Sequence, residues 1–266
     1  MCKHFFIFLE KKIKKEYIII VRKEDNMETI KLNTKNKPLM IAHRGLSSFE
    51  KENTMAAFVA GGNHSYYGME CDIHPTKDNV IVVCHDSNLE RVSGVDLIIE
   101  ESTYEEIHKV SLYDVKKENK WDYLKVPTFA EYLECCIKYN KIAVIEFKFL
   151  FSEEHVIQVL DMIKEKNYLE NCVFISFIYE NLQMVRKYDS TLKAQFLLAD
   201  YKDELINQCI NDKIDIDIHY SFLNQERVDY LHKNNLKINV WTVDNLEKAI
   251  ELSEMGVDFI TTNCLE

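Results

Sequence analysis

Apolar residues in this chain fall into short runs that alternate with longer segments in which apolar positions recur every three to four residues. Short β-branched runs are typical of buried strands, and the longer spacing is typical of amphipathic helices. The pattern predicts strands near residues 39–42, 67–74, 141–147, 172–176, 194–198, 214–218, 237–241 and 257–261. It predicts helices at 53–60, 129–139, 153–166, 179–188, 202–210, 225–234 and 246–254, with Asn53 as the N-cap of the first.

Eight strands alternating with helices match the strand count of a closed (β/α)8 TIM barrel, an α/β fold. An open, doubly wound sheet would usually carry a glycine-rich first turn. Here the turn after the first strand holds one glycine, Gly45, and the whole chain has six. The sequence therefore favours the barrel.

A ninth apolar run, residues 80–84, follows the second strand after only five turn-type residues. A parallel neighbour would need a crossover of a dozen or more residues, so this run is predicted to form a hairpin that folds back over the site. Residues 86–126 lack a strong period and are predicted to be a loop with one short helix at 104–109. Together these segments predict an insertion at about 75–126.

The N-terminal part of the chain is predicted to be an extension, residues 1–36, before a barrel spanning 37–266. The first 26 residues are basic and aliphatic, and we expect them to lie outside the fold. The alternative is a helix or strand that closes the bottom of the barrel. The apolar stretch at 5–9 stops at Glu10, which is too short for a signal peptide or for a membrane span of ~20 residues.

Composition limits the partners. The formal net charge of −11 argues against a nucleic-acid backbone or an anionic membrane surface. It leaves room for a small anionic substrate, because a bound divalent cation can invert the local field. The eight cysteines are scattered with no CxxC pair, which predicts reduced thiols in a cytoplasmic protein.

Three acidic residues lie at the ends of predicted strands. Glu70 and Asp72 are two apart and therefore point the same way, into the barrel mouth, and Glu146 ends another strand. Three carboxylates gathered there would repel one another unless a cation joins them. Ligation by oxygen alone suits a hard ion, so the sequence predicts one divalent cation, Mg²⁺ or Ca²⁺.

Two histidines and two cations fall in the same region. His43 and Arg44 end the first strand, Lys148 follows Glu146, and the hairpin returns His85 to the mouth. Two histidines beside a metal can serve as general acid and general base. Arg44 and Lys148 are predicted to hold an anionic group.

In these residues and their order, the chain resembles the glycerophosphodiester phosphodiesterase family. The resemblance covers roughly residues 39–262, and although each motif alone is weak, six in order are specific. The matching segments are His43-Arg44-Gly45 with Glu52-Asn53-Thr54, Glu70-Cys71-Asp72, the block from Thr76 to Arg91 that contains His85-Asp86, Val126-Pro127-Thr128, Glu146-Phe147-Lys148 and Trp241-Thr242-Val243.

The resemblance implies hydrolysis of glycerophosphodiesters to glycerol 3-phosphate and an alcohol. It implies His43 and His85 as the acid–base pair, and a route through a cyclic phosphate formed by the glycerol 2-hydroxyl. Arg44 and Lys148 would contact phosphate, and Trp241 would line the pocket. The metal ligands it implies are Glu70, Asp72 and Glu146.

Several alternatives stay open from the sequence. The substrate could be a lysophospholipid or a phosphoinositide, although the mostly polar segment 86–126 disfavours a lipid. The barrel could also be an inactive phosphate binder, which the presence of all seven polar residues disfavours. His74 continues the face of Glu70 and Asp72 and is either a neighbour of the site or a solvated hairpin residue. The headgroup, the choice between the two ions, the histidine that acts first and the oligomeric state are not determined.

Overall fold

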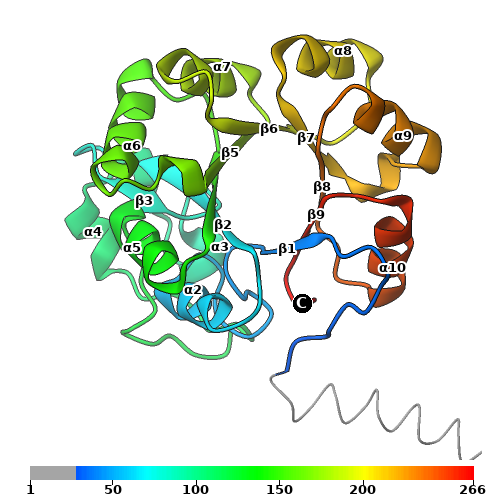
Figure 1. Ribbon diagram of the computed structural model, residues 1–266. Helices are drawn as coiled ribbons and strands as arrows, with labels where there is room; N and C mark the ends of the chain where they lie inside the picture. The colour runs from blue at the N-terminus through cyan, green and yellow to red at the C-terminus, as the bar shows by residue number, and fades with distance from the viewer. Residues whose placement is uncertain (1–27) are drawn as a thin grey trace, which may run out of the picture.

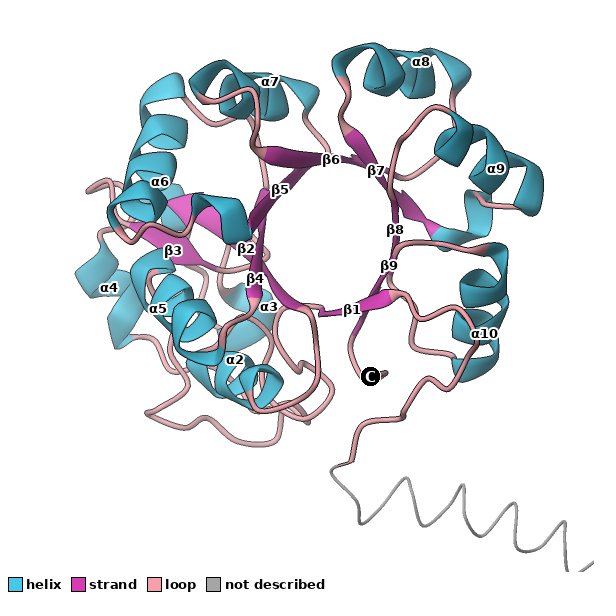
Figure 2. Cartoon of the chain, viewed as in Figure 1, coloured by secondary structure: helices cyan, strands magenta, loops and turns pink. Residues whose placement is uncertain are grey.

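Eight parallel strands close into a ring in the computed structural model, which describes residues 28–266 (Figure 1 and Figure 2). Strand β1 closes the ring because it pairs with both β2 and β9. The ring order is β1 (Leu39–Ala42), β2 (Gly68–Pro75), β4 (Ile142–Phe147), β5 (Cys172–Ser176), β6 (Lys193–Leu198), β7 (Asp215–His219), β8 (Ile238–Trp241) and β9 (Phe259–Thr262). The predicted TIM barrel is confirmed.

Helices form the outer layer of the barrel, as Figure 2 shows down the axis. They are α2 (Met55–Gly62), α5 (Phe129–Tyr139), α6 (Glu153–Glu165), α7 (Tyr179–Tyr188), α8 (Asp203–Asp212), α9 (Gln225–Lys233) and α10 (Leu246–Met255). Side-chain N-caps begin several of them: Thr54, Thr128, Ser152, Asn224 and Asn245 each accept a hydrogen bond from a backbone amide in the first turn. These caps fix where each loop ends and its helix begins.

Buried apolar side chains form two layers, one between the strands and the helices and one inside the ring of strands. Outward-facing strand residues pack with the helices in a large core that includes Phe58, Tyr132 and Phe174. Inward-facing residues form a smaller cluster inside the ring: Ile41, Val144, Val173, Ile175, Leu197 and Phe259. Because alternate strand residues face opposite sides, polar residues at the carboxyl ends of the inward rows must face the barrel mouth.

Strand β3 (Ile81–Val83) lies outside the ring and pairs antiparallel with the end of β2. The turn before it contains Asn79 in a left-handed conformation, φ 61°. The predicted hairpin is therefore confirmed, and a parallel ninth strand is excluded by the pairing.

The insertion has more structure than the sequence predicts. Besides α4 (Tyr104–Lys109), it contains the short helix α3 (Glu90–Ser93) and a 3₁₀ turn, Ile99–Glu101. Its apolar residues form a small core of their own: Val82, Cys84, Leu89, Val92, Ile99, Ile107, Leu112, Leu124 and Val126. They show no sustained period because the elements that carry them are short and are joined by turns and isolated bridges.

The segment just before β1 is attached to the end of the chain. Ile30 forms a parallel bridge with Leu265, and the Leu32 amide donates to the carbonyl of Glu266. The side chain of Glu266 accepts a hydrogen bond at 2.9 Å from the Nδ1 of His64. The expectation for residues 1–26 lies outside the described residues. Within 28–266, no helix combines the length and the apolarity that crossing a bilayer would require.

Two glycines with positive φ allow a matched test of local packing. Gly45 has φ 76°, and an added Cβ would lie 2.6 Å from the carbonyl carbon of Ala57. Gly256, the C-cap of α10, has φ 93° with open space around it. Gly256→Ala should lower the free energy of unfolding by about 1–2 kcal/mol, the cost of the left-handed conformation. Gly45→Ala should cost at least ~1–3 kcal/mol more, because the backbone of α2 must also move.

Urea unfolding of both variants measures this difference. Equal losses would mean that the loop at Gly45 relaxes without disturbing α2.

Candidate functional site

A cavity of about 120 Å³ lies at the carboxyl ends of the strands, where the chemistry of such barrels is found. The polar residues around it that the sequence analysis selected are His43, Arg44, Glu70, His85, Glu146 and Lys148. Trp241 lines the same cavity, and its indole Nε1 donates to the backbone carbonyl of Asp217 at 3.2 Å. Segments far apart in the chain therefore meet where the sequence predicted.

Three buried carboxylates form the centre of the site. Glu70, Asp72 and Glu146 each offer an oxygen within 4.8 Å of the others. Within residues 28–266, Glu70 Oε1 and Asp72 Oδ1 are buried and find no hydrogen-bond partner, although the ammonium of Lys148 lies 3.3 Å from the latter. Buried carboxylate oxygens that converge in this way suit a hard divalent cation, so the donor set fits the predicted metal site.

Burial changes the acidity of these carboxylates. Burial and the neighbouring Asp72 raise the pKa of Glu146 to about 8, and burial with Asp72 and Glu146 raises the pKa of Glu70 well above its usual range. Burial acts in the same direction on Asp72, but Lys148 and Arg44 together hold its pKa below the usual range. In the absence of a cation, the triad therefore carries less negative charge than three carboxylates would.

The two cations also hold the carboxylates in place. Lys148 Nζ donates to Glu146 at 2.8 Å, and Arg44 donates through its backbone amide to Glu70 at 2.8 Å. The guanidinium of Arg44 lies 3.4 Å from Asp72. Both side chains still line the cavity, so each can also meet an anionic ligand there.

His43 has a neutral hydrogen-bond partner. Its Nδ1 lies 2.8 Å from Oδ1 of Asn263, and the amide nitrogen of Asn263 donates to Asp244 at 2.6 Å. Because Asp244 can only accept, it orients the amide with Oδ1 toward His43. His43 Nδ1 is then the donor, and Nε2 is left as an acceptor. Burial, with Arg44 nearby, lowers the pKa of His43 to about 4, so the ring is neutral at pH 7.

His85 has a charged partner instead. Its Nδ1 lies 2.6 Å from Oδ1 of Asp86, and Arg91 binds both Asp86 and Glu52. Burial lowers the pKa of His85, whereas Asp72 and the hydrogen bond to Asp86 oppose this effect. A carboxylate on Nδ1 stabilises the imidazolium form and fixes the ring orientation.

The structure corrects the role expected for Asn53 and decides between the two roles left open for His74. Asn53 is not the N-cap of α2, which is Thr54; it has φ 54° and its amide donates to Asp72 at 2.7 Å. The sequence alone does not show whether a polar residue before a helix caps it or binds elsewhere; here the side chain of Asn53 binds the carboxylate of Asp72.

His74 is buried between Glu100 and the backbone carbonyl of His85, so it borders the site and is not solvated.

Three residues of the site were missed by the sequence analysis: Asp217, which lines the cavity, Asn263, which holds His43, and Asp244, which holds Asn263. Asp217 was detectable, because it lies in the strand pattern Ile214-Asp215-Ile216-Asp217-Ile218, although the sequence does not distinguish it from Asp215. The other two lie in loops after β8 and β9, and their approach to His43 depends on closure of the barrel.

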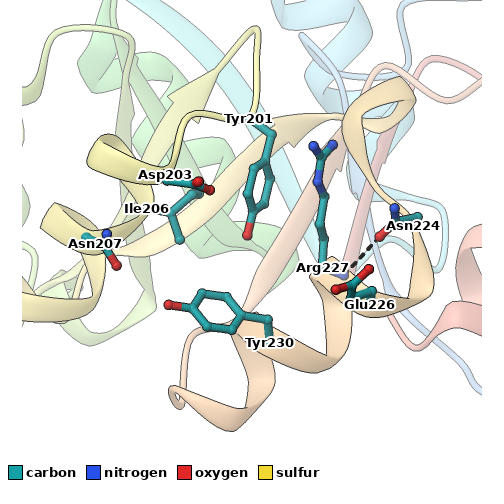
Figure 3. A pocket seen from close by; sticks show the side chains of 8 residues that line it. All are labelled: Tyr201, Asp203, Ile206, Asn207, Asn224, Glu226, Arg227 and Tyr230. Atoms are coloured by element: carbon teal, nitrogen blue, oxygen red, sulfur yellow. Dashed lines mark hydrogen bonds between the residues drawn. The ribbon is translucent and has the colours of Figure 1, made fainter.

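A larger hollow of about 590 Å³ lies on the outer rim, between α8 and α9 (Figure 3). There the guanidinium of Arg227 stacks 4.2 Å from the ring centre of Tyr201 and donates to the carbonyl of Phe222. The guanidinium is thus already partnered, and the described residues that line this hollow include neither a carboxylate triad nor a histidine. The smaller cavity is therefore the candidate active site.

Comparisons with known proteins agree with this geometry. The model of the glycerophosphoryl diester phosphodiesterase family matches residues 43–266. A glycerophosphodiester phosphodiesterase from Caldanaerobacter subterraneus subsp. tengcongensis is 31% identical over 234 residues, covering 85% of this chain and 94% of its own. A glycerophosphodiester phosphodiesterase structure from Parabacteroides distasonis is 26% identical, with a TM-score of 0.69 over 86% of this chain and 94% of its own.

The fold is shared more widely. A phosphodiesterase from Oleispira antarctica, solved with its product sn-glycerol-3-phosphate, superposes with a TM-score of 0.77 at 22% identity. That match covers 85% of this chain and 93% of the other.

The raised pKa of Glu146 predicts how the stability of metal-free protein depends on pH. A carboxyl whose pKa is about 8 when folded and ~4.5 when unfolded binds more protons in the folded state between these values. Stability should therefore fall as pH rises from about 5 to 8, by roughly 3–4 kcal/mol. Mg²⁺ or Ca²⁺ should remove the fall, since the cation favours the ionised carboxylates.

Thermal unfolding at several pH values, with chelator or with added ion, checks this expectation. Glu146→Gln is the matched variant and should reduce the slope in metal-free protein. A stability that stays level or rises over this range without metal would contradict the proposed cause.

Proposed function

The chain belongs to the glycerophosphoryl diester phosphodiesterase family, and we propose that it hydrolyses glycerophosphodiesters to glycerol 3-phosphate and an alcohol. The observation that carries this proposal is the meeting of two histidines, three carboxylates and two cations around one small cavity. The product bound to the phosphodiesterase of Oleispira antarctica is in keeping with it.

Glu70, Asp72 and Glu146 would hold one divalent cation, Mg²⁺ or Ca²⁺. When bound, such an ion offsets the carboxylate charge and polarises a phosphoryl oxygen. Arg44 and Lys148 would bind the remaining phosphoryl oxygens, and Trp241 would cover the glycerol side of the cavity. Anions bound between fixed cations are oriented as well as attracted, which lowers the entropic part of the barrier.

The partners of the two histidines support different first roles. His43 presents an unprotonated Nε2, so it would take the proton of the glycerol 2-hydroxyl as that oxygen attacks phosphorus. His85, held by Asp86, would give a proton to the leaving oxygen as its bond to phosphorus breaks. A cyclic phosphate results. Water then opens it, with His85 accepting the proton of water and His43 returning one to the 2-oxygen.

We also propose a cytoplasmic location. All seven cysteines within residues 28–266 are free, and six of them are buried. Such thiols are typical of a reducing compartment.

The proposed route requires the glycerol 2-hydroxyl. Metal-loaded protein should release glycerol 3-phosphate from glycerophosphocholine, because intramolecular attack gains effective molarities of ~10⁵ M or more. The 2-deoxy analogue should be cleaved orders of magnitude more slowly. Product assays on both compounds, with lysophosphatidylcholine as a third, measure this.

Comparable kcat/KM on the 2-deoxy analogue would contradict the cyclising route but leave the phosphodiesterase in place. Failure to release glycerol 3-phosphate from glycerophosphocholine would overturn the proposed function itself, and release of lysophosphatidic acid from lysophosphatidylcholine in its place would identify a lysophospholipid-cleaving enzyme.

The assigned order of the histidines can be tested with leaving groups. His43→Ala should lose ~10²–10⁴-fold in kcat on both glycerophosphocholine and glycerol p-nitrophenyl phosphate, because both need the base. His85→Ala should lose a similar factor on the choline ester, but the single-turnover release of nitrophenol, which reports the first step alone, should fall much less because that leaving group needs no proton. The rate of each of the two variants on each of the two substrates, relative to the wild type, checks this expectation. The opposite pattern would exchange the two roles.

A further inference from the structure

Asp217 is a buried acid in the candidate active site for which the proposed mechanism has no use. It lies in the middle of β7, is 1% exposed and lines the same cavity as His43 and Glu70. Its Oδ1 has no hydrogen-bond partner in the described part of the chain. An unpartnered, buried oxygen that faces a polar cavity costs stability unless a ligand or water completes it.

The position of β7 separates Asp217 from the metal ligands. In the closed ring, β7 lies four strands from β2 in either direction, so Asp217 faces Glu70 across the barrel. Between them the wall is apolar on the side of β5 and β6, where Ile175 and Leu197 line the cavity. A ligand that spans the cavity therefore meets charge at one end and one carboxyl at the other.

Among residues 28–266, no cation pairs with Asp217. Its polar neighbour is the Asn239 side chain, which also exchanges hydrogen bonds with Thr261 at 3.1 and 3.2 Å. Burial raises the pKa of Asp217 to about 8, so the group is a neutral carboxylic acid at pH 7. A carboxylic acid both donates and accepts, which matches a hydroxyl and does not match a phosphate oxygen alone.

The other residues around the cavity limit which part of the substrate can reach Asp217. The cavity opens to solvent, so the alcohol part of the diester can extend out of it. The phosphoryl group is required at Arg44 and Lys148, and the 2-hydroxyl at His43. The remaining small polar group of the glycerol is its terminal hydroxyl.

We propose that Asp217 binds the terminal hydroxyl of the glycerol moiety and so selects glycerol over smaller diols. This inference rests on the proposed function, because it takes the glycerophosphodiester as substrate. Asp217 would contact the substrate away from the reacting atoms, and it would act on specificity more than on the chemical step.

The test compares glycerophosphocholine with its propane-1,2-diol analogue, which keeps the attacking 2-hydroxyl and lacks the terminal one. Metal-loaded wild-type protein should prefer the glycerol compound by about 10- to 100-fold in kcat/KM, because the analogue leaves Asp217 unpaired. Asp217→Leu should reduce the preference to less than ~3-fold. Asp217→Asn, which can still donate and accept, should keep most of it.

Gln195→Leu is the matched control. Gln195 is also buried, and its Oε1 lies 3.4 Å from Nδ2 of Asn239, but it is not among the residues that line the cavity. The preference of the Gln195→Leu variant for the glycerol compound should therefore equal that of the wild type. Thermal unfolding of each variant separates a loss of selectivity from a loss of fold. An unchanged preference in Asp217→Leu, or a wild type without preference, would overturn the proposal.

Binding measurements test the role of Asp217 independently of whether the protein has the proposed activity. Calorimetry with glycerol 3-phosphate and with propane-1,2-diol phosphate measures the same hydroxyl without turnover. If the wild type cleaves neither diester, the proposed function fails, and the two binding constants in wild type and Asp217→Leu still decide whether Asp217 reads the hydroxyl.

Discussion

Repulsion among three buried carboxylates is the constraint on which the rest of this site depends. Glu70, Asp72 and Glu146 are buried and each offers an oxygen within 4.8 Å of the others, so each charge must be neutralised, bonded or shared with a cation. The protein supplies part of the answer itself. Lys148 and Arg44 face the cluster, and the amide of Asn53 holds one oxygen of Asp72. The free oxygens left over define where a divalent ion fits.

The same cluster explains why some neighbours are charged and others are not. Arg44 is held by Glu52, which Arg91 also binds, and Arg91 binds Asp86 beside His85. A series of ion pairs therefore connects the carboxylate cluster to His85. His43, on the other side, is held by the neutral amide of Asn263. The two rings are chemically alike, and their partners make them different.

Much of the fold and of the site could be predicted from the sequence because both depend on local pattern. Alternating periods predicted eight strands, and the spacing of two residues between Glu70 and Asp72 predicted that both face the mouth. What could not be predicted depends on closure of the ring. Asn263 reaches His43 only because β9 pairs with β1, across more than 200 residues of chain. Asn53 looked like a cap because the carboxylate that competes for it lies in another element.

The division of the cavity into a charged side and an apolar side follows from the ring itself. The strands β1, β2 and β4 carry nearly all the charge, and β5 and β6 present Ile175 and Leu197. An apolar wall raises the cost of any polar atom placed against it, so a single carboxyl on β7 has more effect there than it would among other charges. A substrate with a phosphate at one end and a hydroxyl at the other satisfies both sides at once. A diester without that hydroxyl fills the charged side and leaves Asp217 without a partner, which is how one buried acid far from the reacting atoms can favour glycerol.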